Sequence, residues 1–175
     1  MNFKETEQKI KDYYESLKVI EGLRYRLQIY EDRKKDLEDK INNSSIYLND
    51  NFKAVSYGEV NAKNRGIKAS PQEMAVDNAF AVLEKNLEDV KAEILLIQEQ
   101  ISSIEAKNSD MAFILKGLKP ECKKILEGFY RENDKSCIKL SLELNMDRAT
   151  VYRKKDKIIK DVKKWLEFYN KFHLL

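Results

Sequence analysis

The residues best suited to chemistry lie between positions 147 and 164, where eight Lys and Arg and three Asp and Glu give a net charge of +5. An arginine guanidinium can pair with both acceptors of a guanine edge, and lysine ammonium groups neutralise phosphates. We therefore expect this segment to bind double-stranded DNA. The predicted DNA-binding residues are Arg148, Ala149, Thr150, Tyr152, Arg153, Lys154, Lys155 and Lys157.

Three predicted helices position these side chains. The first starts near Pro120, which suits a first helical turn, and runs to about Arg131. The second covers 137–144 after a cap at Ser136, and the third runs from a cap at Asp147 to about Tyr169. A turn is expected at 133–135, and Asn145 falls where a left-handed backbone is wanted. The predicted inward side chains are Ile125, Leu126, Phe129, Leu140, Leu144, Met146 and Val151, with Ser141 as the small residue between the second and third helices.

This spacing is typical of a helix-turn-helix, whose last helix places its first turns in the major groove. The competing interpretation of Arg148 and Arg153 is a solvated basic helix face, which is common on its own. The helix-turn-helix spacing around them favours base reading. The later lysines, up to Lys164, are expected to contact phosphates or to aid solubility without reading sequence.

The stretch ILKGLKPECKKILEGFYRENDKSCIKLSLELNMDRATVYRKKDKI resembles region 4 of sigma-70-type factors over about residues 114–168. The whole chain resembles phage and prophage late-gene regulators of the ArpU and RinA type. The resemblance implies that Arg148, Ala149, Thr150, Tyr152 and Arg153 face the groove and that Val151 is core. Nothing resembles the promoter-melting region of a full sigma factor, so activation is expected to proceed by recruitment. The chain departs from the pattern at Asn145, where Gly is usual, and at Lys154, where many such helices have an apolar residue.

Two long helices are expected before this module. The first covers about residues 3–42 and has apolar side chains every three or four positions. A polar loop follows at 43–69, in which a short hairpin is conceivable. The second helix, 71–107, begins with the capping box Ser70-Pro71-Gln72-Glu73 and carries an unbroken heptad stripe from Val76 to Ile104. This seam fits either the first helix folded back antiparallel or a second copy of the chain.

The sequence therefore predicts an all-α fold, with a helical hairpin or coiled coil at 1–108 and a helix-turn-helix domain at 109–175. Residues from Lys116 onward carry 16 Lys and Arg against 9 Asp and Glu, a net +7, whereas residues 1–115 carry 17 against 21, a net −4. A basic C-terminal part favours a polyanionic partner.

Several function classes are not expected. The start of the chain has no apolar leader, and no stretch approaches a membrane span, so we predict a cytoplasmic protein without a membrane partner. Cys122 and Cys137 lack further thiol or imidazole ligands nearby, and His173 has no catalytic partner. With no phosphate loop or triad either, we predict no enzyme, no metal and no cofactor.

Three alternatives stay open at this point. The chain could be a DNA-recognising assembly protein similar to a small terminase subunit, or a protein-interaction module that binds RNA polymerase. The third alternative is that the chain forms a homodimer through the coiled coil. The aromatic tail is expected to pack on the module or the coiled coil, with a dimer or RNA polymerase contact as the alternative; it comprises Trp165, Leu166, Phe168, Tyr169 and Phe172.

Overall fold

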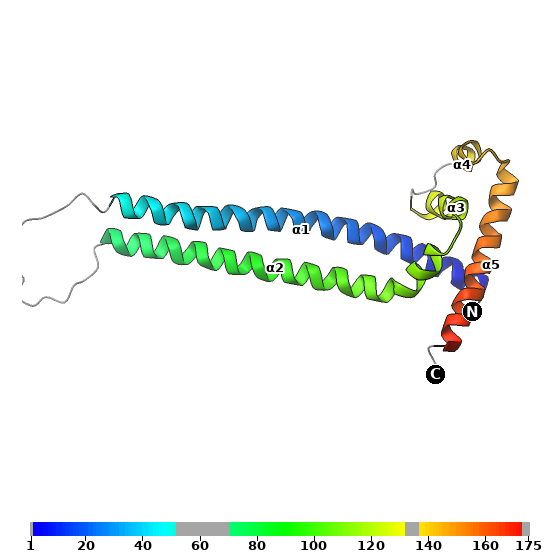
Figure 1. Cartoon of the computed structure of the whole chain (residues 1–175), viewed down its shortest axis with the longest axis horizontal. Coiled ribbons are helices and arrows are strands. Elements are labelled where there is room, and N and C mark those ends of the chain that lie inside the picture. The colour runs from blue at the N-terminus through cyan, green and yellow to red at the C-terminus, as the bar shows by residue number, and fades with distance from the viewer. Residues whose placement is uncertain (1, 52–70, 132–136, 173–175) are drawn as a thin grey trace, which may run out of the picture. The chain divides into compact units, whose positions relative to one another are not determined.

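The computed structural model describes residues 2–51, 71–131 and 137–172, and the regular structure within these ranges is entirely helical (Figure 1). This confirms the all-α prediction, which rests on few Gly and Pro residues and many strong helix formers. The helices are α1 (Phe3–Asn51), α2 (Pro71–Lys116), α3 (Pro120–Tyr130), α4 (Cys137–Glu143) and α5 (Arg148–Phe172).

Both long helices extend further than predicted. The polar residues 42–45 were expected to end the first helix, yet α1 continues to Asn51, so part of the predicted loop 43–69 is helical. The predicted break near Asn108 also fails, because α2 continues to Lys116. The Asn108 side chain instead donates a 2.6 Å hydrogen bond from Nδ2 to the Ser16 Oγ of α1. A cross-helix partner satisfies this amide without ending the helix.

Other expectations lie outside the described residues. These are the hairpin in the rest of the loop, the Ser70 half of the capping box, the turn at 133–135 and the Ser136 cap. Pro71 is the first residue of α2, as the capping box predicts.

The chain divides into two compact units, and the division cuts through both long helices. One unit is 25–99, where the second half of α1 and the first part of α2 lie side by side and bury Leu37, Val90 and Ile97. Val90 and Ile97 belong to the predicted heptad seam, which is therefore an apolar contact face here.

The other unit combines the first 24 residues and residues 100–175. The N-terminal turns of α1 and the last turns of α2 thus share one core with α3, α4 and α5. On α5 the buried side chains recur at helical spacing, as an amphipathic helix requires. This core consists of Ile10, Tyr14, Met111, Ile114, Leu115, Ile125, Leu126, Leu140, Val151, Ile158, Ile159, Val162 and Leu166.

The tightest glycine contact in this unit joins α3 to α4. Gly128 is buried, and a Cβ placed on it would lie 2.3 Å from Cδ1 and 2.9 Å from Cγ of Leu140. Leu140 is itself buried, so it has little room to move away. Glycine at position 128 therefore permits the close approach of α3 and α4.

We expect Gly128→Ala to lower the free energy of unfolding by about 1–3 kcal/mol, because it overpacks this contact. Urea unfolding followed by circular dichroism measures the change. The matched control is Gly22→Ala in α1, where nothing lies within 4 Å of the added Cβ. The control should be neutral or stabilise the protein by up to about 1 kcal/mol, since alanine favours helix over glycine. Equal effects of the two substitutions would contradict the close-approach argument.

Candidate nucleic-acid interface

The turn between α4 and α5 has the predicted local geometry. Asn145 adopts φ 53°, the left-handed conformation expected at this position. The Met146 amide donates a 2.9 Å bond to the Ser141 carbonyl, which closes the turn after α4. The Thr150 amide donates a 2.9 Å bond to Asp147 Oδ1, so Asp147 caps the start of α5.

Asp147 is held in this capping role by its neighbour. The Thr150 hydroxyl also donates to the Asp147 carboxylate. These bonds stabilise the charged form and lower the pKa of Asp147 below its ordinary value. The Thr150 side chain thus helps to start α5.

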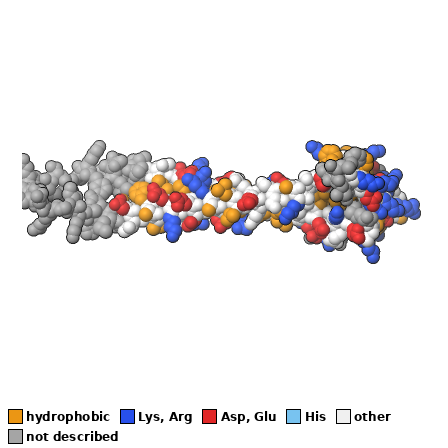
Figure 2. Space-filling view, turned by 90° about the horizontal axis from the view of Figure 1, so that it is seen from below, with side chains coloured by type: hydrophobic (Ala, Val, Ile, Leu, Met, Phe, Trp, Pro, Cys, Tyr) orange, Lys and Arg blue, Asp and Glu red, His pale blue; other side chains and the backbone are white. Residues whose placement is uncertain are grey.

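The predicted residues differ in their exposure along the first turns of α5. Arg148, Ala149 and Arg153 are exposed, whereas Val151 is fully buried. Tyr152 is half-exposed, and its ring lies 5.5 Å, centroid to centroid, from that of Phe129. Figure 2 shows Lys and Arg side chains gathered on the drawn face of the unit that contains α5.

Lys154 and Lys155 differ from the arginines because both form ion pairs within the unit. Lys154 pairs with Glu121 of α3. Lys155 Nζ lies 2.8 Å from Glu7 Oε1 of α1 and 5.3 Å from the centroid of the Phe129 ring. Only 17% of the Lys155 side chain is exposed. These two predicted contact residues therefore hold α5 against α3 and α1, while Lys157 remains exposed on α5.

Glu7 joins three helices at this point. It accepts a 2.8 Å bond from Lys155 of α5 and a 2.7 Å bond from the Tyr130 hydroxyl of α3. The hydrogen bond from Lys155 is the main cause that lowers the pKa of Glu7, and burial opposes it. Burial, followed by the bond to Glu7, raises the pKa of Tyr130. The ion pair is thus a link that orients the candidate interface helix.

We expect Glu7→Gln to lower the free energy of unfolding by about 1 kcal/mol at pH 7, because the amide keeps a hydrogen-bond acceptor but removes the charge. The folded-state pKa of Glu7 is depressed below 4.5. Its contribution is therefore complete above about pH 4.5 and is lost as the pH falls through the folded-state value. Urea unfolding between pH 7 and pH 3 should show the two proteins converging in acid.

The control for this substitution is Glu15→Gln, also in α1. Glu15 forms an exposed pair with Lys11, with 3.8 Å between Nζ and Oε1. Exposed pairs contribute little, so the control should change stability by less than about 0.5 kcal/mol at any of these pH values. A Glu7 effect that did not depend on pH would refute the ion-pair explanation.

The aromatic tail was expected to pack on the module or the coiled coil, and only part of it is packed. Leu166 is buried, and the Tyr169 ring lies 5.6 Å from that of Phe113 in α2. Trp165 and Phe168 are about half-exposed and stand edge to face, 6.1 Å between ring centroids. The Phe172 side chain lies outside the described residues.

The sequence did not predict the Glu7–Lys155 link. The two residues of the link are 148 positions apart, and only Lys155 lies in the predicted helix-turn-helix. For Trp165 and Phe168, the number of aromatic residues in the tail was the only signal in the sequence.

Within the described residues, no group of three His, Cys, Asp or Glu side chains is arranged to hold a metal ion. Cys122 and Cys137 are both free thiols, each partly exposed, and His173 lies outside the described residues. None of the helices in these ranges is long and apolar enough to cross a membrane. Comparisons of the chain with protein-family models, curated proteins and solved structures give no significant match.

Proposed function

We propose that the chain is a sequence-specific DNA-binding regulator in which α4, the turn and α5 act as a helix-turn-helix. The observation that carries the proposal is the pair of exposed arginines at the start of α5. Arg148 and Arg153 are exposed in the first turns of α5, shortly after the left-handed turn at Asn145, while Val151 between them is fully buried. Helix-turn-helix proteins read bases with this part of their second helix.

The side chains divide into different roles under this proposal. Arg148 and Arg153 read base edges, because a guanidinium matches the two acceptors of guanine. Ala149 and the Thr150 methyl group offer apolar contact to a thymine methyl. Tyr152 packs on Phe129 and presents its outer edge to the sugar, while Lys157 contacts phosphate. Lys154 and Lys155 keep α5 in place through their ion pairs.

The resemblance described above extends this proposal. It favours a late-gene regulator of a phage or prophage that activates transcription by recruiting RNA polymerase. The apolar seam between α1 and α2 is used within one chain at Val90 and Ile97. If the remaining surface of the long helices pairs two copies, the operator should contain two half-sites related by symmetry.

Fluorescence anisotropy of the full chain on a labelled 30-base-pair duplex of mixed sequence tests whether DNA is bound. For about four phosphate contacts, affinity should fall roughly a hundredfold between 50 and 200 mM salt. Binding that is absent at low salt would remove the DNA-binding proposal. Light scattering of the same sample separates the assembly alternative, since a ring-sized particle favours a packaging subunit and a monomer or dimer favours a regulator.

A further inference from the structure

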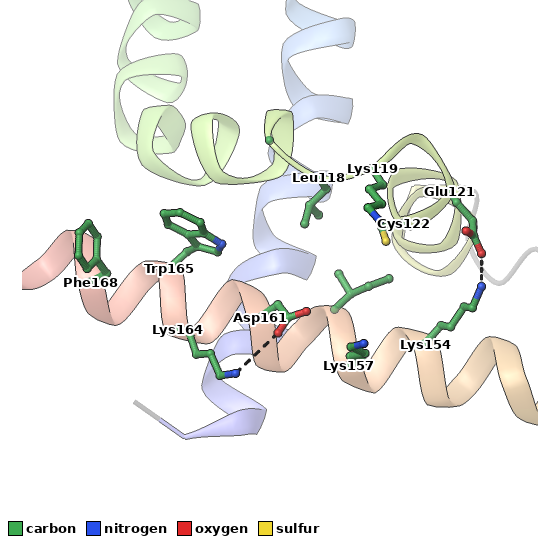
Figure 3. A pocket seen from close by; sticks show the side chains of 12 residues that line it. Leu118, Lys119, Glu121, Cys122, Lys154, Lys157, Asp161, Lys164, Trp165 and Phe168 are labelled. Atoms are coloured by element: carbon green, nitrogen blue, oxygen red, sulfur yellow. Dashed lines mark hydrogen bonds and ion pairs between the residues drawn. The ribbon is translucent and has the colours of Figure 1, made fainter.

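An apolar groove of about 820 Å³ lies between α5 and the segment that joins α2 to α3 (Figure 3). Leu118 and Cys122 line one side, and Ile158, Trp165 and Phe168 line the other. A second hollow of about 380 Å³ adjoins it, and Trp165 lines both. The two hollows therefore form one continuous surface that passes the chain's single tryptophan; we call it the Trp165 groove.

Large aromatic side chains are exposed along this groove. The exposed fractions are 62% for Phe113, 53% for Trp165 and 52% for Phe168. Soluble proteins rarely gather such side chains on one surface unless the surface binds something. Tryptophan and other aromatic residues also supply much of the binding energy at protein interfaces.

The charged rim of the Trp165 groove is mainly positive. Lys154 pairs with Glu121, and Lys164 Nζ lies 3.9 Å from the Asp161 carboxylate (Figure 3). Within the part of the chain that the structure describes, Lys119 and Lys157 have no carboxylate within ion-pair distance, and both line the groove. Two lysines are thus left without an internal counter-charge beside an apolar floor.

We propose that the Trp165 groove binds an acidic amphipathic helix of a partner protein. Along α5 the groove runs from Lys154 to Phe168, about 21 Å, which matches roughly four turns of a bound helix. Apolar side chains at every third or fourth position would enter the groove, and flanking Glu and Asp side chains would meet Lys119 and Lys157.

The lining of the groove favours such a peptide over a nucleic acid. Leu118, Ile158 and Trp165 form an apolar floor, and a charged phosphate backbone gains nothing from losing its water there. An amphipathic helix can instead bury apolar side chains on this floor. The Trp165 end of the groove is separate from the first base-reading residue, since Arg148 and Trp165 are about 26 Å apart along α5. Lys157 belongs to both proposed surfaces, whereas Lys119 and Trp165 belong to the groove alone, so the groove can be tested independently of DNA binding.

Two display libraries of 16-residue helices test this proposal on the full chain. Both randomise the apolar face, and the flanking positions are Glu and Asp in one library and Lys and Arg in the other. We expect binders from the acidic library only. Because Trp165 is the only tryptophan, their binding should shift its emission to shorter wavelength as water is excluded. Trp165→Ala should weaken binding about tenfold or more.

Lys119→Glu should weaken the binding of the same peptides, although it leaves the apolar floor intact. Tyr25 is an exposed aromatic residue of the other unit, and Tyr25→Ala should leave the binding of the peptides unchanged. The proposal is overturned if the acidic library gives no binders. It is also overturned if the selected peptides bind the Trp165→Ala variant as tightly as the unchanged chain while that variant keeps its helical content. An emission shift that depends on protein concentration alone would also overturn it, because the occupant would then be a second copy of the chain. The same holds if single-stranded DNA shifts the emission equally.

Discussion

The double substitution Arg148→Ala and Arg153→Ala should lower the affinity of the chain for its preferred duplex by about a hundredfold to a thousandfold. Each well-aligned arginine–guanine pair contributes about 1–3 kcal/mol, and about 1.4 kcal/mol corresponds to a factor of ten. Both side chains are exposed at the start of α5, so their loss should leave the core intact. Anisotropy titrations at one fixed salt concentration measure the change, and affinity for unrelated duplexes should fall much less.

The matched control removes the same charge from the other unit. Arg26→Ala and Arg33→Ala together change two exposed arginines of α1 within residues 25–99. This variant should keep the preference for the selected duplex to within about threefold, because only a general electrostatic contribution is lost. If both double variants lost affinity equally, the arginines of α5 would contribute charge without reading sequence.

Leu140→Ala should lower the free energy of unfolding by about 2–5 kcal/mol, the range for a fully buried leucine that leaves a cavity. Leu140 is 1% exposed and contacts Gly128 where α3 meets α4. Leu142, two residues later on the same helix, is 74% exposed, and Leu142→Ala should change stability by less than about 0.5 kcal/mol. Urea unfolding of the three proteins gives the comparison.

Combining Leu140→Ala with Gly128→Ala sharpens this prediction. The space left by the leucine side chain accepts the added methyl group, so the two effects should not add. Additive losses would mean that the α3–α4 contact is not the reason for either effect.

The C-terminal helices could be predicted because their signals are local. Pro120 indicates the start of α3, and Asp147 caps α5 through bonds to a residue three positions away. Asn145 tolerates the left-handed backbone better than most residues do, so its position indicated the turn. The inward pattern of Leu140 and Val151 follows from helical periodicity alone.

The features that could not be predicted depend on distant contacts. The sequence around Asn108 predicts a helix end, because the bond from Asn108 to Ser16 depends on a residue 92 positions away. Lys155 resembles its basic neighbours in sequence, and only the fold brings Glu7 and Phe129 to it. The DNA-contacting roles of the α5 side chains remain predictions, since they depend on a partner.

Selection of duplexes from a random-sequence pool by the full chain at physiological salt tests the central claim most directly. The proposal predicts enrichment of a common sequence that contains guanines at the positions read by Arg148 and Arg153, and loss of that enrichment in the double alanine variant. A pool that stays random after repeated rounds, with the protein folded throughout, would contradict sequence-specific DNA binding by α5.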